Sequence, residues 1–262
     1  MNEKQLAEQF YSAHQWSVLN DPIETCTQRA LALDSTLLKQ VAKGEQPATI
    51  RLWECPQSLI VSRKEARLAD FDSACDTLAQ LGWPVSVRES GGTAVPHGPG
   101  ILNFSLIFAQ TKDQPLDLDA IYISLCEPIR NALRNLGLQS EYGETPGAYC
   151  DGRFNLNIDA LKVTGTAQRV ALSPANDLGL YRAVLAQAMI MIEADPHDTT
   201  GIVNQFYQLA GGDNCYDPHA STSVDRHLAG HYPNGKLTQV IRQEILLALR
   251  DFNTDIDPQL EF

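Results

Sequence analysis

The sequence predicts an α+β fold in which helices flank a mixed, largely antiparallel sheet. Helix-like and strand-like stretches are interleaved along the 262 residues, and several strand-like stretches pair as hairpins rather than as steady βαβ units. No internal repeat, low-complexity tract or Gly/Ser linker divides the chain, and its length suffices for one large core. We therefore expect a single domain over residues 1–262, with a helical C-terminal tail from about residue 231.

Several stretches have the apolar spacing of amphipathic helices. In the first, Leu33, Leu37 and Val41 recur at helical intervals, and Gly44 is a natural stop. Glycines also follow the next two stretches, where helices commonly end. We expect helices over residues 24–43, 71–81, 117–136, 200–209, 224–229 and 236–252.

Strands are expected where short apolar runs lie between turn-forming residues. Phe154, Leu156 and Ile158 alternate with polar residues, which is the period of a half-buried strand. Asp159-Ala160 is suited to the centre of a tight turn into the next strand, which carries Lys162. The other expected strands cover residues 49–53, 59–62, 85–87, 101–108 and 183–192.

Composition and charge exclude several classes of function. The net charge of −12 argues against nucleic acid or an anionic membrane as the main partner, because phosphate binding needs a basic face. The polar N-terminus lacks the apolar stretch of a signal peptide. The longest apolar run, 186–192, has the length of a strand and is too short to span a membrane. The six cysteines are scattered without a CxxC pair or a close Cys/His cluster. We expect reduced thiols, a cytoplasmic location and no metal.

A glycine-rich loop connects the strand at residue 85 with the apolar run that begins at Ile101. Gly91 and Gly92 allow the backbone to approach a ligand closely or to take a positive φ. Arg88 and His97 flank this bare backbone, so the loop is suited to holding the polar end of a ligand. A plain hairpin or a bulge explains the same pattern.

Cys150 and Lys162 are the other residues that could carry chemistry. Cys150 lies in a short polar turn between Gly147 and Gly152, where its thiol would be accessible. A thiolate is the attacking form, and because a free cysteine has a pKa of about 8.5 it needs a nearby positive charge or base. Lys162 follows the reverse turn and could fold back to the same place. Taken alone, the two residues are also consistent with a surface cysteine and a solvated lysine.

Two motifs together resemble the lipoate-protein ligase and octanoyltransferase family. They are RESGGTAVPHGPGILNFS and, further along, GRFNLNIDALKVTGTAQR, and the likeness covers about residues 24 to 230. The resemblance implies the catalytic-domain fold of the biotin/lipoyl protein ligases. It also implies that the first motif holds the head group of an acyl chain and that the second supplies an invariant lysine. The residues concerned are Arg88, Ser90, Gly91, Gly92, Ala94, Val95 and His97, then Lys162, Gly165, Thr166 and Ala167.

The sequence departs from the family pattern at two loop positions. Glu89 replaces a common arginine or proline, and Gly98 replaces a frequent aspartate. The first change weakens any interpretation of the loop as a phosphate clamp. The Arg-rich loop of biotin ligases is missing, so biotin is not the expected substrate.

The resemblance leaves three functions to distinguish. Cysteine-dependent octanoyl- and lipoyltransferases place a catalytic cysteine where this chain has Cys150, and they need no cofactor. The resemblance then implies that Cys150 takes the acyl group from acyl carrier protein or a glycine-cleavage carrier protein. A lysine in a lipoyl domain of a 2-oxoacid dehydrogenase would accept it. In this reading Lys162 favours the thiolate, the run 101–108 lines an apolar tunnel, and backbone N–H groups near Gly91-Gly92 or Gly165-Thr166 stabilise the oxyanion.

The alternatives use the same fold differently. An ATP-dependent lipoate-protein ligase would need ATP and Mg, and Lys162 would contact a lipoyl-adenylate while Cys150 is incidental. Such ligases usually add an accessory domain, and the tail after residue 230 is too short for one. A non-catalytic lipoyl- or acyl-binding protein would keep the pocket without turnover.

Overall fold

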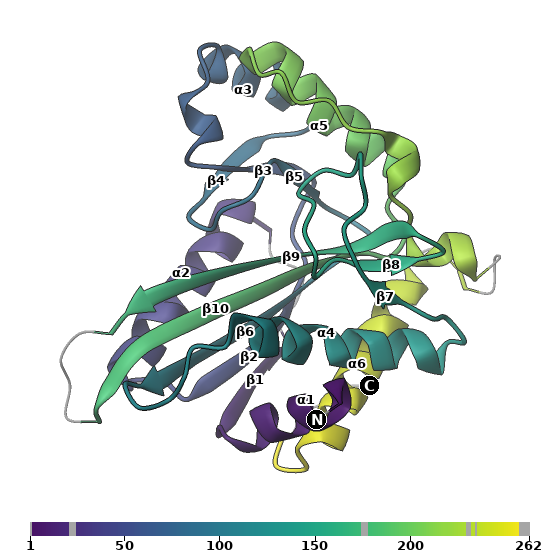
Figure 1. Cartoon of the computed structure of the whole chain (residues 1–262). Helices are drawn as coiled ribbons and strands as arrows, with labels where there is room; N and C mark the ends of the chain where they lie inside the picture. The colour runs from purple at the N-terminus through teal and green to yellow at the C-terminus, as the bar shows by residue number, and fades with distance from the viewer. Residues whose placement is uncertain (1, 21–24, 174–177, 229–231, 234, 257–262) are drawn as a thin grey trace.

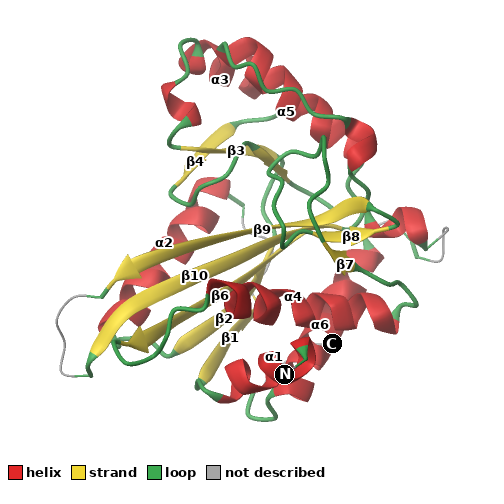
Figure 2. Ribbon diagram, in the orientation of Figure 1, coloured by secondary structure: helices red, strands yellow, loops and turns green. Residues whose placement is uncertain are grey.

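Two sheets of unequal size organise the molecule. The computed structural model describes residues 2–20, 25–173, 178–228, 232–233 and 235–256. Within them, a seven-stranded sheet has the order β1-β2-β6-β10-β9-β8-β7, and a three-stranded sheet has the order β4-β3-β5. Figures 1 and 2 show the small sheet above the large one, with α3 and α5 on top of it and α1, α4 and α6 below the large sheet. The mixed, mostly antiparallel sheet confirms the expected fold class.

The elements of the large sheet and its helices come from all parts of the chain. The strands are β1 Trp16–Asn20, β2 Ala48–Trp53, β6 Ile101–Thr111, β7 Glu141–Tyr142, β8 Leu156–Ile158, β9 Leu161–Leu172 and β10 Leu180–Met191. The helices are α1 Glu3–Ser12, α2 Thr27–Lys43, α4 Leu118–Asn135 and α6 Lys236–Phe252. The small sheet consists of β3 Ser58–Ser62, β4 Val85–Arg88 and β5 Val95–His97, with α3 Phe71–Gln80 and α5 Pro196–Ala210. Short 3-10 helices cover Glu65–Arg67, Pro218–Ala220 and Val224–His227.

Strand alternation divides the large sheet into two different faces. One side of β6 belongs to the main apolar core, which lies between the large sheet and helices α1, α4 and α6. Its side chains there are Leu102, Phe104, Leu106 and Phe108. The intervening Ile107 faces the other way and packs against α2. Because successive side chains of a strand point to opposite faces, Asn103 and Ser105 lie on the same face as Ile107. This second face is only partly covered by α2, and the small sheet covers the remainder.

An ion pair is buried where α2 meets this second face. Arg51 on β2 donates to Asp34 on α2 at 2.7 Å, and both side chains are almost fully buried. The hydroxyl of Ser105 and the amide of Gln187 also donate to Asp34, at 2.9 and 2.8 Å. The carboxylate therefore collects donors from three neighbouring strands and fixes α2 on the sheet.

Most expected elements are confirmed, and the differences have physical reasons. The first helix and strand of the chain were missed because α1 buries only Ala7 and Tyr11 and therefore lacks a broad apolar stripe. Its real signal is the capping box between Asn2 and Gln5. The expected helix over 224–229 is a 3-10 turn, Val224–His227, and residue 229 lies outside the described residues. Asp159 and Ala160 form the predicted tight turn, with φ of 50° and 63°.

None of the helices among the described residues is long and apolar enough to cross a membrane.

Replacing Asp34 with alanine should cost about 3–5 kcal/mol of unfolding free energy, because it leaves the Arg51 charge buried without its partner. Asp119→Ala is the matched control, since it breaks the exposed Arg153–Asp119 pair and should cost less than about 1 kcal/mol. Chemical denaturation of the two variants and the parent protein measures both. Similar losses in the two variants would contradict the role of the buried pair.

Candidate active site

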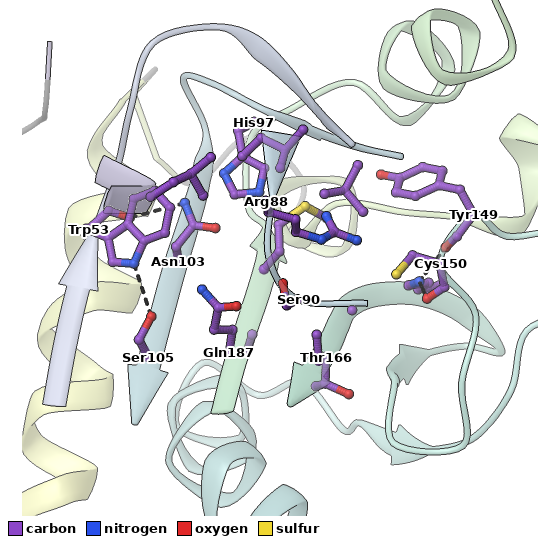
Figure 3. A pocket seen from close by; sticks show the side chains of 18 residues that line it. Trp53, Arg88, Ser90, His97, Asn103, Ser105, Tyr149, Cys150, Thr166 and Gln187 are labelled. Atoms are coloured by element: carbon purple, nitrogen blue, oxygen red, sulfur yellow. Dashed lines mark hydrogen bonds between the residues drawn. The ribbon is translucent and has the colours of Figure 1, made fainter. Parts of the chain in front are cut away.

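A cavity lies between the large sheet and the small sheet, and it contains most of the candidate residues. The space between its lining atoms, including the open mouth, is about 550 Å³. Figure 3 shows Tyr149 and Cys150 on one side of it and Trp53, Asn103 and Ser105 on the other. The candidates that line it are Arg88, Ser90, Val95, His97, Cys150, Lys162, Gly165, Thr166 and Ala167.

The remaining candidates lie outside this cavity. Gly91 and Gly92 line a second, outer groove, which shares Cys150 with the cavity. Ala94 lines neither space and is fully buried. Its N–H donates to Glu65 at 2.8 Å and to the Tyr207 hydroxyl at 3.1 Å, so this residue anchors the loop instead of facing a ligand.

Cys150 lies where the inner cavity and the outer groove meet. It is half-buried, and its φ of 47° is left-handed, which is uncommon for a residue with a side chain. Its N–H donates to the hydroxyl of Thr93 in the glycine loop at 2.8 Å. The thiol is therefore held on a fixed turn that borders the inner cavity on one side and the outer groove on the other.

The glycine loop approaches the thiol very closely. A Cβ on Gly92 would lie 2.8 Å from Cys150 Sγ and 2.8 Å from Arg88 Nη2, and the φ of this glycine is +101°. Arg88 donates to the carbonyl oxygens of Gly91 and Thr93, at 3.0 and 2.8 Å. Its guanidinium is thus a neighbour of the thiol and also braces the loop. Only a glycine at position 92 leaves room for this arrangement.

Lys162 reaches the cavity because of a bulge in β9. Lys162 pairs with Asn157 and Thr164 pairs with Leu156, so β9 has one more residue than β8 over this step. A bulge of this kind breaks the regular alternation and re-aims side chains. Val163 and Leu156 belong to the core on the helix-covered face, whereas Lys162 lines the cavity.

The Lys162 ammonium binds the backbone of the cysteine turn. Its Nζ donates to the carbonyl oxygens of Tyr149 and Cys150, both at 2.6 Å. Burial lowers the pKa of Lys162 to about 8, while the charges of Cys150 and Asp151 act in the opposite direction. Lys162 therefore positions the turn that carries Cys150 through two hydrogen bonds. For a transferase, the sequence had suggested only an effect of the Lys162 charge on the thiol.

The apolar surface of the cavity comes mostly from elements other than the run 101–108. The run 101–108 contributes Asn103 and Ser105 to the lining, because its large apolar side chains face α4 instead. Gln187 and Met189 of β10 continue the floor of the cavity. The expectation of an apolar wall from this strand was therefore wrong, since the alternation of β6 places its polar residues inward.

His97 is part of the wall as a neutral ring. Burial, aided by the charge of Arg88, lowers the pKa of His97 to about 3. Its ring is 5.7 Å from the ring of Trp53, and its Nδ1 is 3.8 Å from Cys55 Sγ. An uncharged histidine is compatible with an apolar ligand next to it.

The departure at Glu89 has a structural explanation. Its carboxylate accepts from Arg63 at 2.6 Å and forms a second ion pair with Arg169. Glu89 therefore serves as the acidic partner of two arginines at the edge of the glycine loop. Within the described residues, no group of three His, Cys, Asp or Glu side chains is arranged to hold a metal ion.

Sequence reasoning missed several lining residues. Asn103 and Ser105 belong to the first motif, and Trp53 ends the expected strand 49–53, but the sequence predicted no role for any of them. Thr93 and Tyr149, which hold the cysteine turn, act through a hydroxyl and a backbone carbonyl. Gln187 had no local signal, since it is one polar residue within the apolar stretch 183–191 of β10.

Comparisons of the sequence and of the structure with known proteins lead to the same family of ligases and acyltransferases. The family model of the lipoyl protein ligase A/B catalytic domain matches residues 27–229. An uncharacterized protein of Cupriavidus necator is 36% identical over 81% of this chain and 83% of its own length. An octanoyl-[GcvH]:protein N-octanoyltransferase of Kyrpidia tusciae is 31% identical over 94% of this chain and 83% of its own. The crystal structure of lipoate-protein ligase A bound with ATP has a TM-score of 0.65 at 18% identity, covering 91% of this chain and 84% of that chain, which shows a shared fold.

Gly92→Ala should slow alkylation of Cys150 by iodoacetamide by about ten- to a hundredfold, because the added methyl group occupies the space beside Sγ and strains the loop. Gly91→Ala is the matched control, since a Cβ there meets nothing within 4 Å. Peptide mapping measures the rate at each cysteine, and the exposed Cys215 serves as an internal reference. Equal rates at Cys150 in the two variants would contradict the close approach.

The stability contributed by Lys162 should rise with pH. Its pKa is lowered from 10.5 to about 8 in the folded protein, so the unfolded chain binds more protons between these values. The burial penalty of the ammonium is therefore fully present below pH 8 and disappears as the pH rises to 10.5. The unfolding free energy relative to Lys162→Met should increase across this window and stay flat below it. Denaturation of both proteins at pH 7 and pH 10 tests the sign, and a difference that does not change with pH would contradict it.

Proposed function

This chain belongs to the lipoyl protein ligase A/B catalytic-domain family, and we propose that it moves an octanoyl or lipoyl group through a thioester on Cys150 to a lysine of a lipoyl-carrier domain. The activity is acyl transfer in protein lipoylation, which is the activity in the names of its relatives. The thioester on Cys150 is supported chiefly by one observation. Cys150 lies at the junction of the inner cavity and the outer groove and lines both of them.

The two spaces around Cys150 suit the two parts of an acylated carrier. The inner cavity is bounded on one side by Ile60, Val95 and His97 of the small sheet, and most of its exposed surface is apolar. The outer groove contains the stacked rings of Tyr122 and Phe154 and the glycines of the loop. An acyl chain in the cavity would place its carbonyl carbon at Cys150, and the lysine arm of the carrier would leave through the groove.

The chemistry then proceeds in two steps. The Cys150 thiolate attacks the carbonyl carbon of the donor, the C–S bond forms, and the bond to the carrier's nitrogen or sulfur breaks as that atom takes a proton. The ε-amine of the acceptor lysine next attacks the thioester, loses a proton and releases the thiol. Arg88 is the cation beside Sγ and is suited to stabilising the thiolate.

The tetrahedral intermediates need hydrogen-bond donors for their oxygen. The N–H of Cys150 already donates to the Thr93 hydroxyl, so it is less suited to bind this oxygen. Gly91 and Gly92 lie beside Cys150 on the outer groove, and Gly165 and Thr166 lie beside it in the cavity. β8 pairs with β9 only up to Thr164, which leaves that edge of β9 open from Gly165 onward. The backbone N–H groups of either pair are suited to donating hydrogen bonds to the oxyanion.

The carrier partners follow from this assignment. We propose the glycine-cleavage carrier protein as a donor, since it is the carrier in the names of the relatives, with acyl carrier protein as a second donor. The lipoyl domains of 2-oxoacid dehydrogenases are the proposed acceptors, and the cytoplasm is the proposed location. No cofactor is needed in this mechanism. ATP and Mg would enter only if the protein were a ligase.

The decisive experiment is the mass of the acylated protein. Incubation with an octanoylated carrier should add one octanoyl group to the parent protein, and Cys150→Ala should abolish the adduct and acyl transfer while leaving the fold intact. Cys215→Ala is the matched control and should leave both unchanged, because this exposed thiol lies away from the cavity.

Two other outcomes would overturn the proposal. An unmodified protein that exchanges pyrophosphate into ATP in the presence of lipoate would be a ligase. A protein that binds octanoate or lipoate but shows neither reaction would be a non-catalytic binder.

A further inference from the structure

The outer groove has two charged lining residues, and one of them is next to the thiol. They are Asp151, which directly follows Cys150 in the chain, and Arg153. Arg153 forms an ion pair with Asp119, and its guanidinium lies 4.8 Å from the centre of the Phe154 ring. Because Arg153 has its own acidic partner, the Asp151 carboxylate is the charge that a ligand beside the thiol would meet.

The exposed side chain of Asp151 is held in one orientation through a single oxygen. Its Oδ1 accepts from the backbone N–H groups of Thr145 and Gly152, at 2.8 and 2.9 Å. The side-chain amide of Asn155 donates to the same oxygen at 2.7 Å. Among the residues that the structure describes, none donates to Oδ2. One oxygen thus fixes the carboxylate, and the other is available to a donor on a ligand.

Two aromatic rings line the same groove. Tyr122 of α4 is stacked on Phe154, with ring centroids 4.8 Å apart and ring planes inclined by 13°. Both side chains are half-buried, so part of each ring is exposed. Methylene groups pack against such rings, and the π-system attracts a cation. A lysine side chain matches this groove, because it has an apolar stem for the rings and an ammonium for the Asp151 carboxylate.

We infer that Asp151 binds the ε-ammonium of the carrier lysine and directs its nitrogen to the thioester on Cys150. This inference rests on the proposed function, which brings that lysine into the outer groove. It adds a residue that recognises the acceptor by its charge, next to the residue that carries the acyl group. The rings of Tyr122 and Phe154 then hold the methylene stem behind the nitrogen.

The carboxylate also stabilises the charge that develops during acyl transfer. The bound ammonium gives one proton to solvent water, and the resulting amine attacks the carbonyl carbon. As the C–N bond forms, the nitrogen becomes positively charged and donates a hydrogen bond to Asp151. The C–S bond then breaks, the sulfur leaves with the electron pair, and the proton lost by the nitrogen converts the thiolate into the thiol. A donor linked through a lysine amide passes through the reverse of these steps, so its leaving nitrogen meets the same carboxylate.

The test follows the second step alone. The Cys150 adduct is formed with an octanoylated carrier and separated from it, and either a lipoyl domain or hydroxylamine is added. Intact mass gives the rate at which the adduct is lost. Asp151→Asn should slow transfer to the lysine of the lipoyl domain by about ten- to a hundredfold, because a hydrogen bond between charged groups is lost. Cleavage by hydroxylamine, which is uncharged at neutral pH, should keep its rate.

The variants are chosen to preserve the cysteine turn. Asp151→Asn keeps a carbonyl oxygen that can accept from Thr145 and Gly152. Asp151→Ser is a second neutral variant if the first does not fold, since a serine hydroxyl makes the same kind of turn bond more weakly. Asp213→Asn is the matched control for the lost charge, because Asp213 is exposed and lines neither the cavity nor the groove. It should leave both rates unchanged.

The outcomes separate the inference from the proposed function. If the parent protein forms no acyl adduct with any carrier, the proposed function fails and the inference fails with it. If the adduct forms and the folded Asp151 variants transfer it to the lysine at the parent rate, the function stands and Asp151 does not bind the lysine. Equal losses of rate with the lipoyl domain and with hydroxylamine would make Asp151 a structural residue of the turn and overturn the inference. An equal loss in Asp213→Asn would overturn it as well.

Discussion

The candidate site depends on the two hydrogen bonds from the Lys162 ammonium to the carbonyl oxygens of Tyr149 and Cys150. They hold a turn whose cysteine has a left-handed backbone, a conformation that needs support from its surroundings. An apolar side chain of similar length would leave both carbonyl groups without these hydrogen bonds. The cost of burying the ammonium is visible in its lowered pKa of about 8. In return, the two hydrogen bonds of the ammonium fix the position of the Cys150 thiol.

The glycine loop supports the same turn from the other side. Thr93 accepts from the Cys150 N–H, and Gly92 leaves the space in which the thiol and the Arg88 guanidinium become neighbours. The loop is fixed in turn by the N–H of Ala94, which donates to the buried Glu65 carboxylate. The two sequence motifs thus meet at one residue, and each determines the environment of Cys150. This is why a loop that looks like a ligand cradle in the sequence also shapes the reactive group.

Residue patterns were sufficient for the parts of the fold that depend on local structure. Periodicity located α2, α4 and α6, and the Asp159-Ala160 turn brought Lys162 back toward Cys150. The orientation of Lys162 was not predictable, because it depends on a bulge that appears only when β8 and β9 pair. The polar floor was missed for a related reason. The alternation along β6 separates an apolar face from a face that carries Asn103 and Ser105. It does not show that a cavity lies against the second face, because that depends on how α2 and the small sheet pack there.

The polar row on this floor explains how a mostly apolar cavity can border a buried ion pair. Burial raises the pKa of the Asp34 carboxyl, and the charge of Arg51 and the donors from Arg51, Ser105 and Gln187 oppose this effect. Each donor that turns toward Asp34 is withdrawn from the cavity, so most of the surface that remains there is apolar. The same bonds fix Trp53 through Ser105 and Arg51. The ion pair and its hydrogen bonds behind the Trp53 indole thereby hold an apolar surface in one position. Apolar packing alone would restrict this surface less, because it lacks directional bonds.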